Sequence, residues 1–380
     1  MRSPFVCAAP LLALLLATAA RAAVSNPDIS VIGQPAIRWT DEPGSGARRR
    51  PVLDAGETEF VFDAALNPYA RGWFTAAFAD GEATIEEGYF TLQRGLPGGL
   101  ALKGGKYRVG FGKTNAIHPH QLPFAERPGV LAAFLPGGES FNDTGVELSW
   151  RVPFPGTWSV TASADALQGD SFRVPRVPGA DPNDPLTLDP EDGDAQSEPR
   201  AAWLGRLAAF APAGDRSGVE LGVTFMEGTN NVAARARMRV FGGDLKAKLW
   251  TAPDAYLLLQ GEFLSFDRDD AGWDGVAGRY ALSGAAATGG FLFADFNWAR
   301  RYNVGAFVES FQDPVTDGGR QTALGVHAGL SLMEETTAFR LDWRRIRPAR
   351  PAGATADTDA IQQLTLRAIF SMGPHKAHQF

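Results

Sequence analysis

The most constraining feature of this sequence is an alternation of apolar and polar residues that recurs in short segments along most of the chain. In the segment 145–151, Val146, Leu148 and Trp150 fall on one face of an extended chain, and polar residues fall on the other. The same pattern recurs in segments 157–166, 217–226, 339–344 and 363–368. A period of two residues predicts β-strands with one apolar face, so the fold class is all-β.

Two β architectures share this pattern and differ in where the apolar face points. A soluble β-sandwich turns its apolar face inward. A membrane barrel turns it toward lipid, and each tilted strand needs about ten residues to cross the hydrocarbon layer. The alternating segments have that length, and their polar faces carry many opposite charges, as a wet lumen tolerates. The pattern therefore favours a transmembrane antiparallel up-and-down β-barrel.

The spacing of these segments predicts about sixteen strands, with longer and shorter connections alternating along the chain. The pair Gly242-Gly243 interrupts the alternation and is typical of a bulge or a tight turn, which leaves fourteen to eighteen strands open. An even number would place both chain ends in the periplasm. The predicted strands are 29–39, 58–66, 70–79, 84–93, 100–111, 142–152, 157–168, 200–210, 217–226, 235–250, 255–265, 288–299, 302–311, 320–332, 337–347 and 359–372.

Composition agrees with this interpretation only after the alternation is recognised. The 380 residues are 44% hydrophobic, with a formal net charge of −7. The mean hydropathy of −0.14 does not suggest a bundle of membrane helices. The acidic balance argues against nucleic-acid binding, which needs a dominant basic face. A mean near zero is what results when lipid-facing and lumen-facing residues are averaged.

The first residues are typical of a secretory signal peptide. Arg2 precedes an apolar run over 6–20, and Ala20-Arg21-Ala22 offers small residues for cleavage. We therefore expect a signal peptide at 1–22 and a single barrel domain at 23–380, in the bacterial outer membrane. The one cysteine, Cys7, lies in the signal, and export without disulfides fits a cell-envelope protein. The last residue, Phe380, predicts recognition by the barrel-assembly machinery.

Seven stretches in the first part of the chain carry a resemblance to known proteins: 26–33, 67–71, 86–91, 96–100, 104–115, 118–124 and 127–128. They resemble a family of bacterial outer-membrane porin-like proteins, chiefly over residues 26–150. Members of this family are sometimes labelled zinc-regulated TonB-dependent receptors. The resemblance implies a barrel in the outer membrane and fixes no substrate. The receptor label fits poorly, because such receptors need a plug domain and about 22 strands.

The segment from Gly110 to Phe141 is the most chemically mixed connection. We expect it to fold into the lumen and narrow the pore, with its charges setting ion preference. The alternative is an external lid with solvated charges. Its candidate residues are Lys113, His118, His120, Glu126 and Arg127.

His118 and His120 alternate, so an extended segment could place both imidazoles on one face, as a metal ion requires. His375 and His378 form a second, looser pair. The sequence offers no cysteine or tight carboxylate motif beside them, so the metal prediction rests on the two histidines alone. No cofactor is predicted.

Charged residues at alternating positions are candidates for the lumen face. Mixed charge predicts a water-filled pore of modest selectivity. The alternative is charge pairing that only stabilises a closed lumen. The basic candidates are Arg235, Arg237, Arg239, Lys246, Lys248, Arg340, Arg344 and Arg367. The acidic candidates are Glu87, Glu147, Asp165, Glu220, Glu262, Asp295 and Asp342.

The acidic, proline-rich stretch 168–200 reads as a solvated external loop, which could attract divalent ions that bridge lipopolysaccharide. No catalytic motif is present, so an enzyme is not expected. We expect a porin-like channel for small polar solutes or ions. The alternative is a barrel with a closed lumen that binds or adheres through its external loops. Outer-membrane lipids and lipopolysaccharide are expected partners, and a homo-oligomer fits by analogy with porins.

Overall fold

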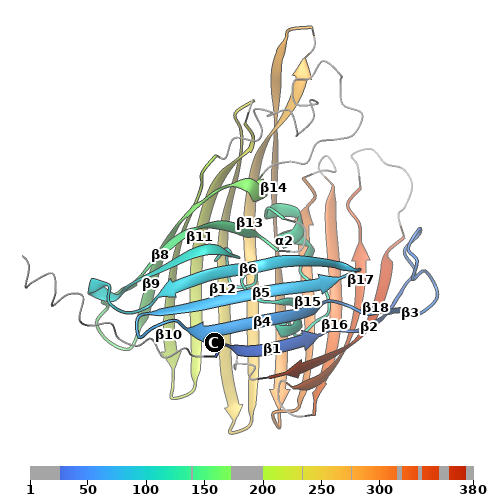
Figure 1. Ribbon diagram of the computed structural model, residues 1–380. Helices are drawn as coiled ribbons and strands as arrows, with labels where there is room; N and C mark the ends of the chain where they lie inside the picture. Colours follow the sequence, from blue (N-terminus) through green and yellow to red (C-terminus); the bar gives the residue numbers. More distant parts are fainter. Residues whose placement is uncertain are drawn as a thin grey trace, which may run out of the picture.

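The computed structural model describes residues 26–137, 140–172, 200–232, 234–274, 276–314, 319–332, 336–350 and 359–373. Over these residues the chain forms one antiparallel sheet that closes on itself (Figure 1). The predicted signal peptide, most of the acidic stretch, the pair His375 and His378, and Phe380 lie outside the described residues.

The sheet contains eighteen strand segments, and three short 3-10 turns and one helical turn accompany them. The segments are β1 (Asp28–Gly33), β2 (Ala36–Thr40), β3 (Val52–Asp54), β4 (Thr58–Ala65), β5 (Ala70–Ala79), β6 (Glu82–Leu92), β7 (Leu100–Arg108), β8 (Asn142–Val152), β9 (Ser159–Leu167), β10 (Ala202–Ala213), β11 (Ser217–Asn231), β12 (Ala236–Ala252), β13 (Ala255–Asp274), β14 (Arg279–Trp298), β15 (Tyr302–Gln312), β16 (Arg320–Ser331), β17 (Thr337–Arg347) and β18 (Ile361–Met372). The helical pieces are η1 (Pro97–Gly99), η2 (Pro119–Gln121), α2 (Gly129–Phe134) and η3 (Asp170–Phe172).

These segments form sixteen strands, as predicted. β1 and β2 both pair with β18, and β1 pairs with β4 while β2 pairs with β3. Hence β1 with β2, and β3 with β4, are each one interrupted strand. Pro35 accounts for the first interruption, since proline cannot donate to the ladder. The two interruptions face each other: the backbone N–H of Gln34 donates to the backbone carbonyl oxygen of Glu57 at 3.1 Å.

The predicted irregularity at Gly242-Gly243 is wrong. β12 runs through both glycines in unbroken register with β11, and the register shifts of this pair and of β12 with β13 lie elsewhere. A Cβ at Gly242 would lie 2.8 Å from the ring of Phe111. The glycine therefore makes room for a side chain inside the barrel, which is a packing requirement rather than a turn.

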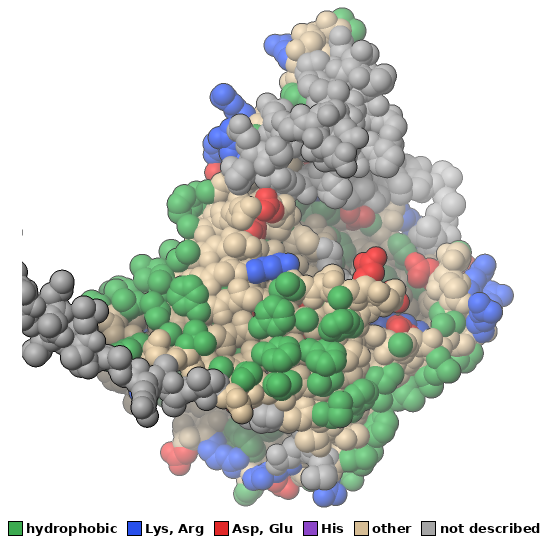
Figure 2. Space-filling view, viewed as in Figure 1, with side chains coloured by type: hydrophobic (Ala, Val, Ile, Leu, Met, Phe, Trp, Pro, Cys, Tyr) green, Lys and Arg blue, Asp and Glu red, His purple; other side chains and the backbone are tan. Residues whose placement is uncertain are grey.

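Apolar side chains cover the outer surface of the barrel, as the alternation predicts. Leu221, Phe241 and Phe263 are about half exposed, at 57%, 50% and 57%. Figure 2 shows apolar side chains gathered over β4, β5 and β6. An exposed apolar surface of this extent needs lipid, and a closed barrel leaves no unpaired edge there, so the chain is an outer-membrane barrel.

Within the described residues, no helix has the length and apolar character needed to cross a membrane.

The connections differ at the two ends of the barrel. At one end, strands join through short turns such as 214–216 and 299–301. At the other end, longer connections dominate, with Asp80-Gly81 as a tight exception whose two residues have positive φ. β13 and β14 are twenty residues each and rise above their neighbours at this end (Figure 1). The predicted connection 266–287 is therefore mostly a paired hairpin.

Candidate functional site

The connection between β7 and β8, residues 109–141, enters the barrel, and we call it the lumen segment. Among its described residues, Phe111, Phe124, Leu131 and Phe134 are fully buried. It contains η2 and α2 and contacts the inner face of strands on several sides of the barrel. The alternative of an external lid is wrong, because these side chains pack inside the sheet.

One side of the lumen is aromatic. The Phe124 ring lies 5.1 Å from the Phe293 ring and 5.2 Å from the Phe307 ring, between ring centroids. The Phe134 ring lies 5.2 Å from Phe266 in the same way. The inner face of β13 to β15 is therefore not the polar wall that simple alternation predicts. A dry wall is needed there because the lumen segment buries its own apolar side chains against it.

Hydrogen bonds to two glutamates of the same wall also hold the lumen segment on its aromatic side. The Val130 amide donates to Glu309 of β15 at 2.8 Å. The amides of Lys113 and Thr114 donate to Glu262 of β13 at 3.0 and 2.7 Å. The turn before them has Gly112 at φ +60°, where a Cβ would lie 2.1 Å from a Glu262 oxygen. Only glycine allows this approach to the carboxylate.

Next to the aromatic side, arginines from β17 and β18 hold the backbone of the lumen segment. Arg340 donates to the His120 carbonyl oxygen at 2.9 Å, and Arg344 donates to that of Glu126 at 2.5 Å. Arg367 donates to the carbonyl oxygens of Phe124 and Ala125 at 2.8 and 3.3 Å. Charged donors to buried carbonyl groups are among the stronger hydrogen bonds in proteins.

A third contact joins the histidines to an acidic wall. Glu59 of β4 lies between them: its two carboxylate oxygens are 3.0 Å from His118 Nδ1 and 3.1 Å from His120 Nδ1. Glu87 of β6 lies 3.0 Å from the other ring nitrogen of His118. All four side chains are buried. Burial and the nearby Arg108 lower the pKa of His118, but Glu59 and Glu87 outweigh them and raise it to about 9.

A β-bulge brings a further carboxylate to this wall. In the pairing of β5 with β6, Thr75 faces Glu87 and Ala76 faces Ile85, so Glu86 is the extra residue. The bulge turns both adjacent glutamates toward the lumen, which regular alternation forbids. Arg108 donates to both oxygens of Glu86 at 2.9 and 3.0 Å.

A group of half-buried charges lines the lumen beside this segment. Lys103 pairs with Glu147 at 2.9 Å, and Lys113 pairs with Glu220 at 2.7 Å. The side chains of these pairs are 14 to 25% exposed, in contrast to the fully buried aromatic side. Charges of both signs thus reach solvent inside the barrel on the side of β7, β8 and β11.

Most predicted site residues lie at the lumen. The lumen segment carries Lys113, His118, His120, Glu126 and Arg127, and Arg127 braces the segment by donating to Asn115 at 2.7 Å. The strand residues that face inward at alternating positions are Glu147, Arg340 and Arg344. Arg38 of β2, which the sequence analysis missed, forms an ion pair with Glu126.

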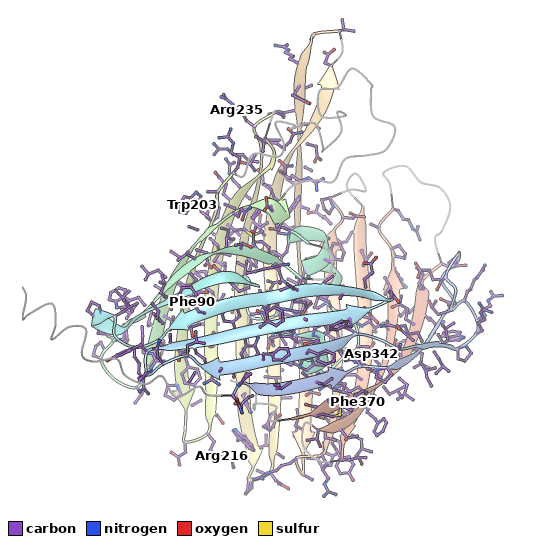
Figure 3. All side chains as sticks on the ribbon, in the orientation of Figure 1. Phe90, Trp203, Arg216, Arg235, Asp342 and Phe370 are labelled. Atoms are coloured by element: carbon purple, nitrogen blue, oxygen red, sulfur yellow. The ribbon has the colours of Figure 1, made fainter. Side chains whose placement is uncertain are left out.

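The prediction was wrong for the arginines of β12. Ala236, Met238 and Val240 are buried, so Arg237 and Arg239 point outward. Both pair with Glu227 of β11, at 2.7 and 2.6 Å. Arg235 lies in the exposed turn before β12, near the long-loop end, and Arg216 lies near the other end (Figure 3). The prediction assumed that charge always marks the lumen face, which holds only at the depth of the lipid.

The predicted site residues also did not include Glu59, Glu86 and Glu309. For Glu59 a signal existed, because Phe60 and Phe62 alternate with it and must face lipid. For Glu86 the signal was two adjacent glutamates in a strand, which is typical of a bulge. No sequence signal separates Glu309 from other inward-facing carboxylates.

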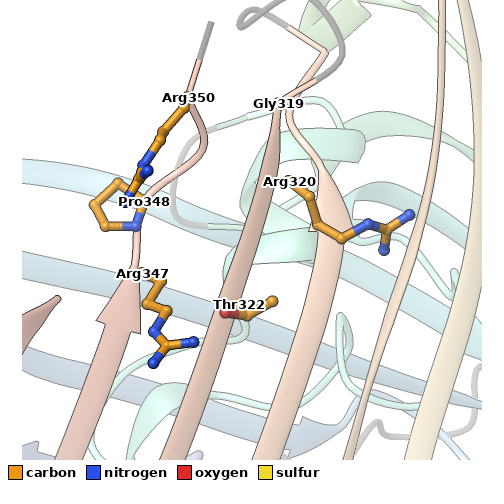
Figure 4. A pocket seen from close by; sticks show the side chains of 6 residues that line it. All are labelled: Gly319, Arg320, Thr322, Arg347, Pro348 and Arg350. Carbon is orange, nitrogen blue, oxygen red and sulfur yellow. The ribbon is translucent and has the colours of Figure 1, made fainter. Parts of the chain in front are cut away.

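A separate pocket of about 350 Å³ lies at the long-loop end of β16 and β17 (Figure 4). Thr322 and Arg347 are paired neighbours on the outer face, opposite the inward-facing Ala323 and Ile346. Arg320 is also exposed there and donates to Ser310 at 3.0 Å. Arg350 completes a pocket with three guanidinium groups outside the barrel.

Comparison with known proteins supports the fold. No family model matches the chain. An uncharacterized protein of Aquifex aeolicus is 30% identical over 216 residues, which cover 54% of this chain and 44% of that protein. The match thus spans less than half the length of that relative.

Three solved structures show the same architecture. An anion-selective porin from Comamonas acidovorans is 9% identical, with a TM-score of 0.57 over 91% of this chain and 99% of that one. The outer-membrane channel DcaP of Acinetobacter baumannii is 10% identical, with a TM-score of 0.56 over 91% and 97%. OmpF of Salmonella typhi, in complex with daunomycin, is 10% identical, with a TM-score of 0.56 over 91% and 98%. The chain shares the porin fold, and sixteen strands do not support the TonB-dependent receptor label.

Proposed function

We propose that the chain is a porin-like channel in which the lumen segment narrows the passage, and that small polar solutes or ions cross along the half-buried charged side. The observation that carries this proposal is the pair of partly exposed ion pairs, Lys103 with Glu147 and Lys113 with Glu220, beside a fully buried aromatic side. Partly hydrated charges of both signs favour polar solutes and give modest ion selectivity. The channel proteins of the same fold are compatible with this role.

Single-channel recording of the refolded full-length protein in planar bilayers tests the proposal. We expect discrete openings, and a larger conductance after deletion of residues 116–138, because the lumen segment would no longer cross the barrel. Arg237→Gln on the outer face is the matched control and should leave conductance unchanged. An unchanged conductance in the deletion variant, with the barrel still folded, would rule out the lumen segment as the constriction.

The runner-up function is a barrel with a closed lumen whose external loops bind a partner. The tall β13–β14 hairpin and the aromatic contacts inside the lumen favour it. Absence of any openings from folded wild-type protein would select this function over the channel. The oligomeric state and the assembly signal at Phe380 stay predictions.

The arginine pocket on the outer rim supports the predicted lipopolysaccharide partner. Arg320, Arg347 and Arg350 present guanidinium groups, which pair well with phosphate, at the end that faces the cell exterior in this fold. Arg347→Gln should weaken co-purification of lipopolysaccharide, whereas Arg300→Gln at the short-turn end should not. Equal retention by both variants would contradict this partner site.

A further inference from the structure

We propose that Glu59, His118 and His120 bind a divalent transition-metal ion that fastens the lumen segment to the barrel wall. The site goes beyond the proposed channel function, because it would exist whether or not solutes pass. It joins two elements far apart in sequence: the histidines of the lumen segment and a glutamate of β4.

The positions of the donor atoms suit a small metal ion. One ligand atom from each of the three residues lies within 4.8 Å of the others. The Glu59 carboxylate oxygens lie 3.0 Å from His118 Nδ1 and 3.1 Å from His120 Nδ1. Two donors at about 2.0–2.1 Å from a tetrahedral zinc ion lie about 3.3 Å apart, so small side-chain shifts would complete the geometry.

The surroundings of His118 are those of a metal-bound imidazole. When Nδ1 binds a metal, the opposite nitrogen carries a proton and usually donates it to a carboxylate. Here that nitrogen lies 3.0 Å from Glu87. Glu87 also accepts from the Arg108 amide at 3.1 Å, which fixes the carboxylate in place. Glu87 is thus a positioning residue rather than a ligand.

The charge balance of the wall also favours a cation. Four carboxylates, from Glu57, Glu59, Glu86 and Glu87, lie on this wall. Arg108 pairs with Glu86, and Arg340 approaches the site through the His120 carbonyl oxygen. Glu57, Glu59 and Glu86 also bring one oxygen each within 4.8 Å of one another. Burying this excess of negative charge is unfavourable unless cations accompany it. A divalent ion held by neutral histidines would offset two of those charges. The competing arrangement is a protonated His118 that bridges Glu59 and Glu87 without metal.

The proposal is tested by metal binding to the refolded full-length protein, without any transport measurement. We expect Zn²⁺ titration calorimetry at neutral pH to show one ion per chain, and Co²⁺ to give a visible spectrum of nitrogen and oxygen ligands. His120→Ala should weaken binding about 100-fold or more. Glu87→Gln, which keeps all three ligands, should weaken it about 10- to 100-fold. Glu87→Gln is nearly isosteric, so we expect this variant to fold. Its lower Zn²⁺ affinity then tests the site even if His120→Ala does not fold.

Two controls separate this site from others. Glu227→Gln changes a carboxylate on the outer face of the barrel and should leave the Zn²⁺ affinity unchanged. The double change His375→Ala and His378→Ala removes the other histidine pair and should also leave it unchanged. Absence of bound metal in folded wild-type protein, or binding that survives His120→Ala but is lost with the terminal pair, would overturn the proposal. A channel without metal would leave the proposed function intact.

Discussion

The two sides of the lumen hold the same segment by different physical means. On the aromatic side, Phe124 and Phe134 pack against phenylalanines of β13 to β15. On the polar side, arginines and glutamates of β4, β6, β17 and β18 bind its backbone and its histidines. Apolar packing is strong but has little direction, whereas hydrogen bonds fix position. The difference indicates that the aromatic side supplies most of the free energy that holds the lumen segment in the barrel. The polar side fixes the position of the segment.

Arg344 connects the two sides. Its guanidinium lies 5.1 Å from the Phe124 ring centroid and 4.6 Å from that of Phe307, and it also donates to the Glu126 carbonyl oxygen. A cation over two aromatic rings is favourable in a desolvated site.

The largest effect is expected from Phe124→Ala on the aromatic side. The ring is fully buried among Phe293 and Phe307, so its loss should lower the free energy of unfolding by about 3–5 kcal/mol. Urea unfolding in detergent, followed by tryptophan fluorescence, measures the change. Phe241→Ala on the lipid-facing surface is the size-matched control and should have a smaller effect. Equal losses from both variants would mean that the aromatic contact does not hold the segment.

A smaller loss is expected from Arg367→Met on the polar side. The change leaves the carbonyl groups of Phe124 and Ala125 without this donor, and it also removes a buried charge. We expect a net loss of about 2 kcal/mol, because the two contributions oppose each other. The same urea unfolding assay applies. A loss of stability greater than that of Phe124→Ala would mean that the polar side contributes more than the aromatic side to holding the lumen segment.

Glu309→Gln tests a carboxyl group on the aromatic wall that binds the lumen segment at α2. Glutamine still accepts a hydrogen bond from the Val130 amide, but without charge, so we expect a loss of about 1 kcal/mol. Glu227→Gln on the outer face is the control and should change stability less, because its arginine partners are solvated. Equal losses of stability in the two variants would indicate that the charge of Glu309 does not strengthen its hydrogen bond with the Val130 amide.

The smallest effect on stability, below about 0.5 kcal/mol, is expected from Lys113→Gln, because its ion pair with Glu220 is partly hydrated. The same change should shift the reversal potential toward cation preference in a salt gradient, because it removes a positive charge at the passage. Glu220→Gln should shift it in the opposite direction. If neither shifts the potential, ions do not cross on this side of the lumen.

Much of the barrel could be predicted from the sequence because lipid enforces the alternation at every strand. The strands 70–79 and 142–152 have the predicted bounds, and sixteen strands form. Predictions were wrong where lipid imposes no constraint. Above the membrane, Arg237 and Arg239 are free to face outward, and β13 and β14 stay paired beyond the predicted strand ends at 265 and 288.

The lumen was predictable only in part, since two kinds of contact define it. His118, Glu126 and Arg344 are recognisable as polar residues in a connection or on an inward face. The aromatic side is not recognisable in this way, because Phe291 and Phe293 of β14 look like lipid-facing residues until the parity of the strand is known. Gly242 shows the same limit: its purpose is clear only when Phe111 is seen beside it.

The pairing of β18 with both β1 and β2 has a consequence for assembly. The ring closes only when the last strand meets the first. The last two strands, β17 and β18, carry Arg340 and Arg367, which bind the lumen segment from more than 200 positions later in the chain. Contacts between such distant positions form slowly. The lumen segment therefore makes its contacts with Arg340 and Arg367 only after the last strands have joined the sheet. Ring closure and the final attachment of the segment then occur together, late in folding.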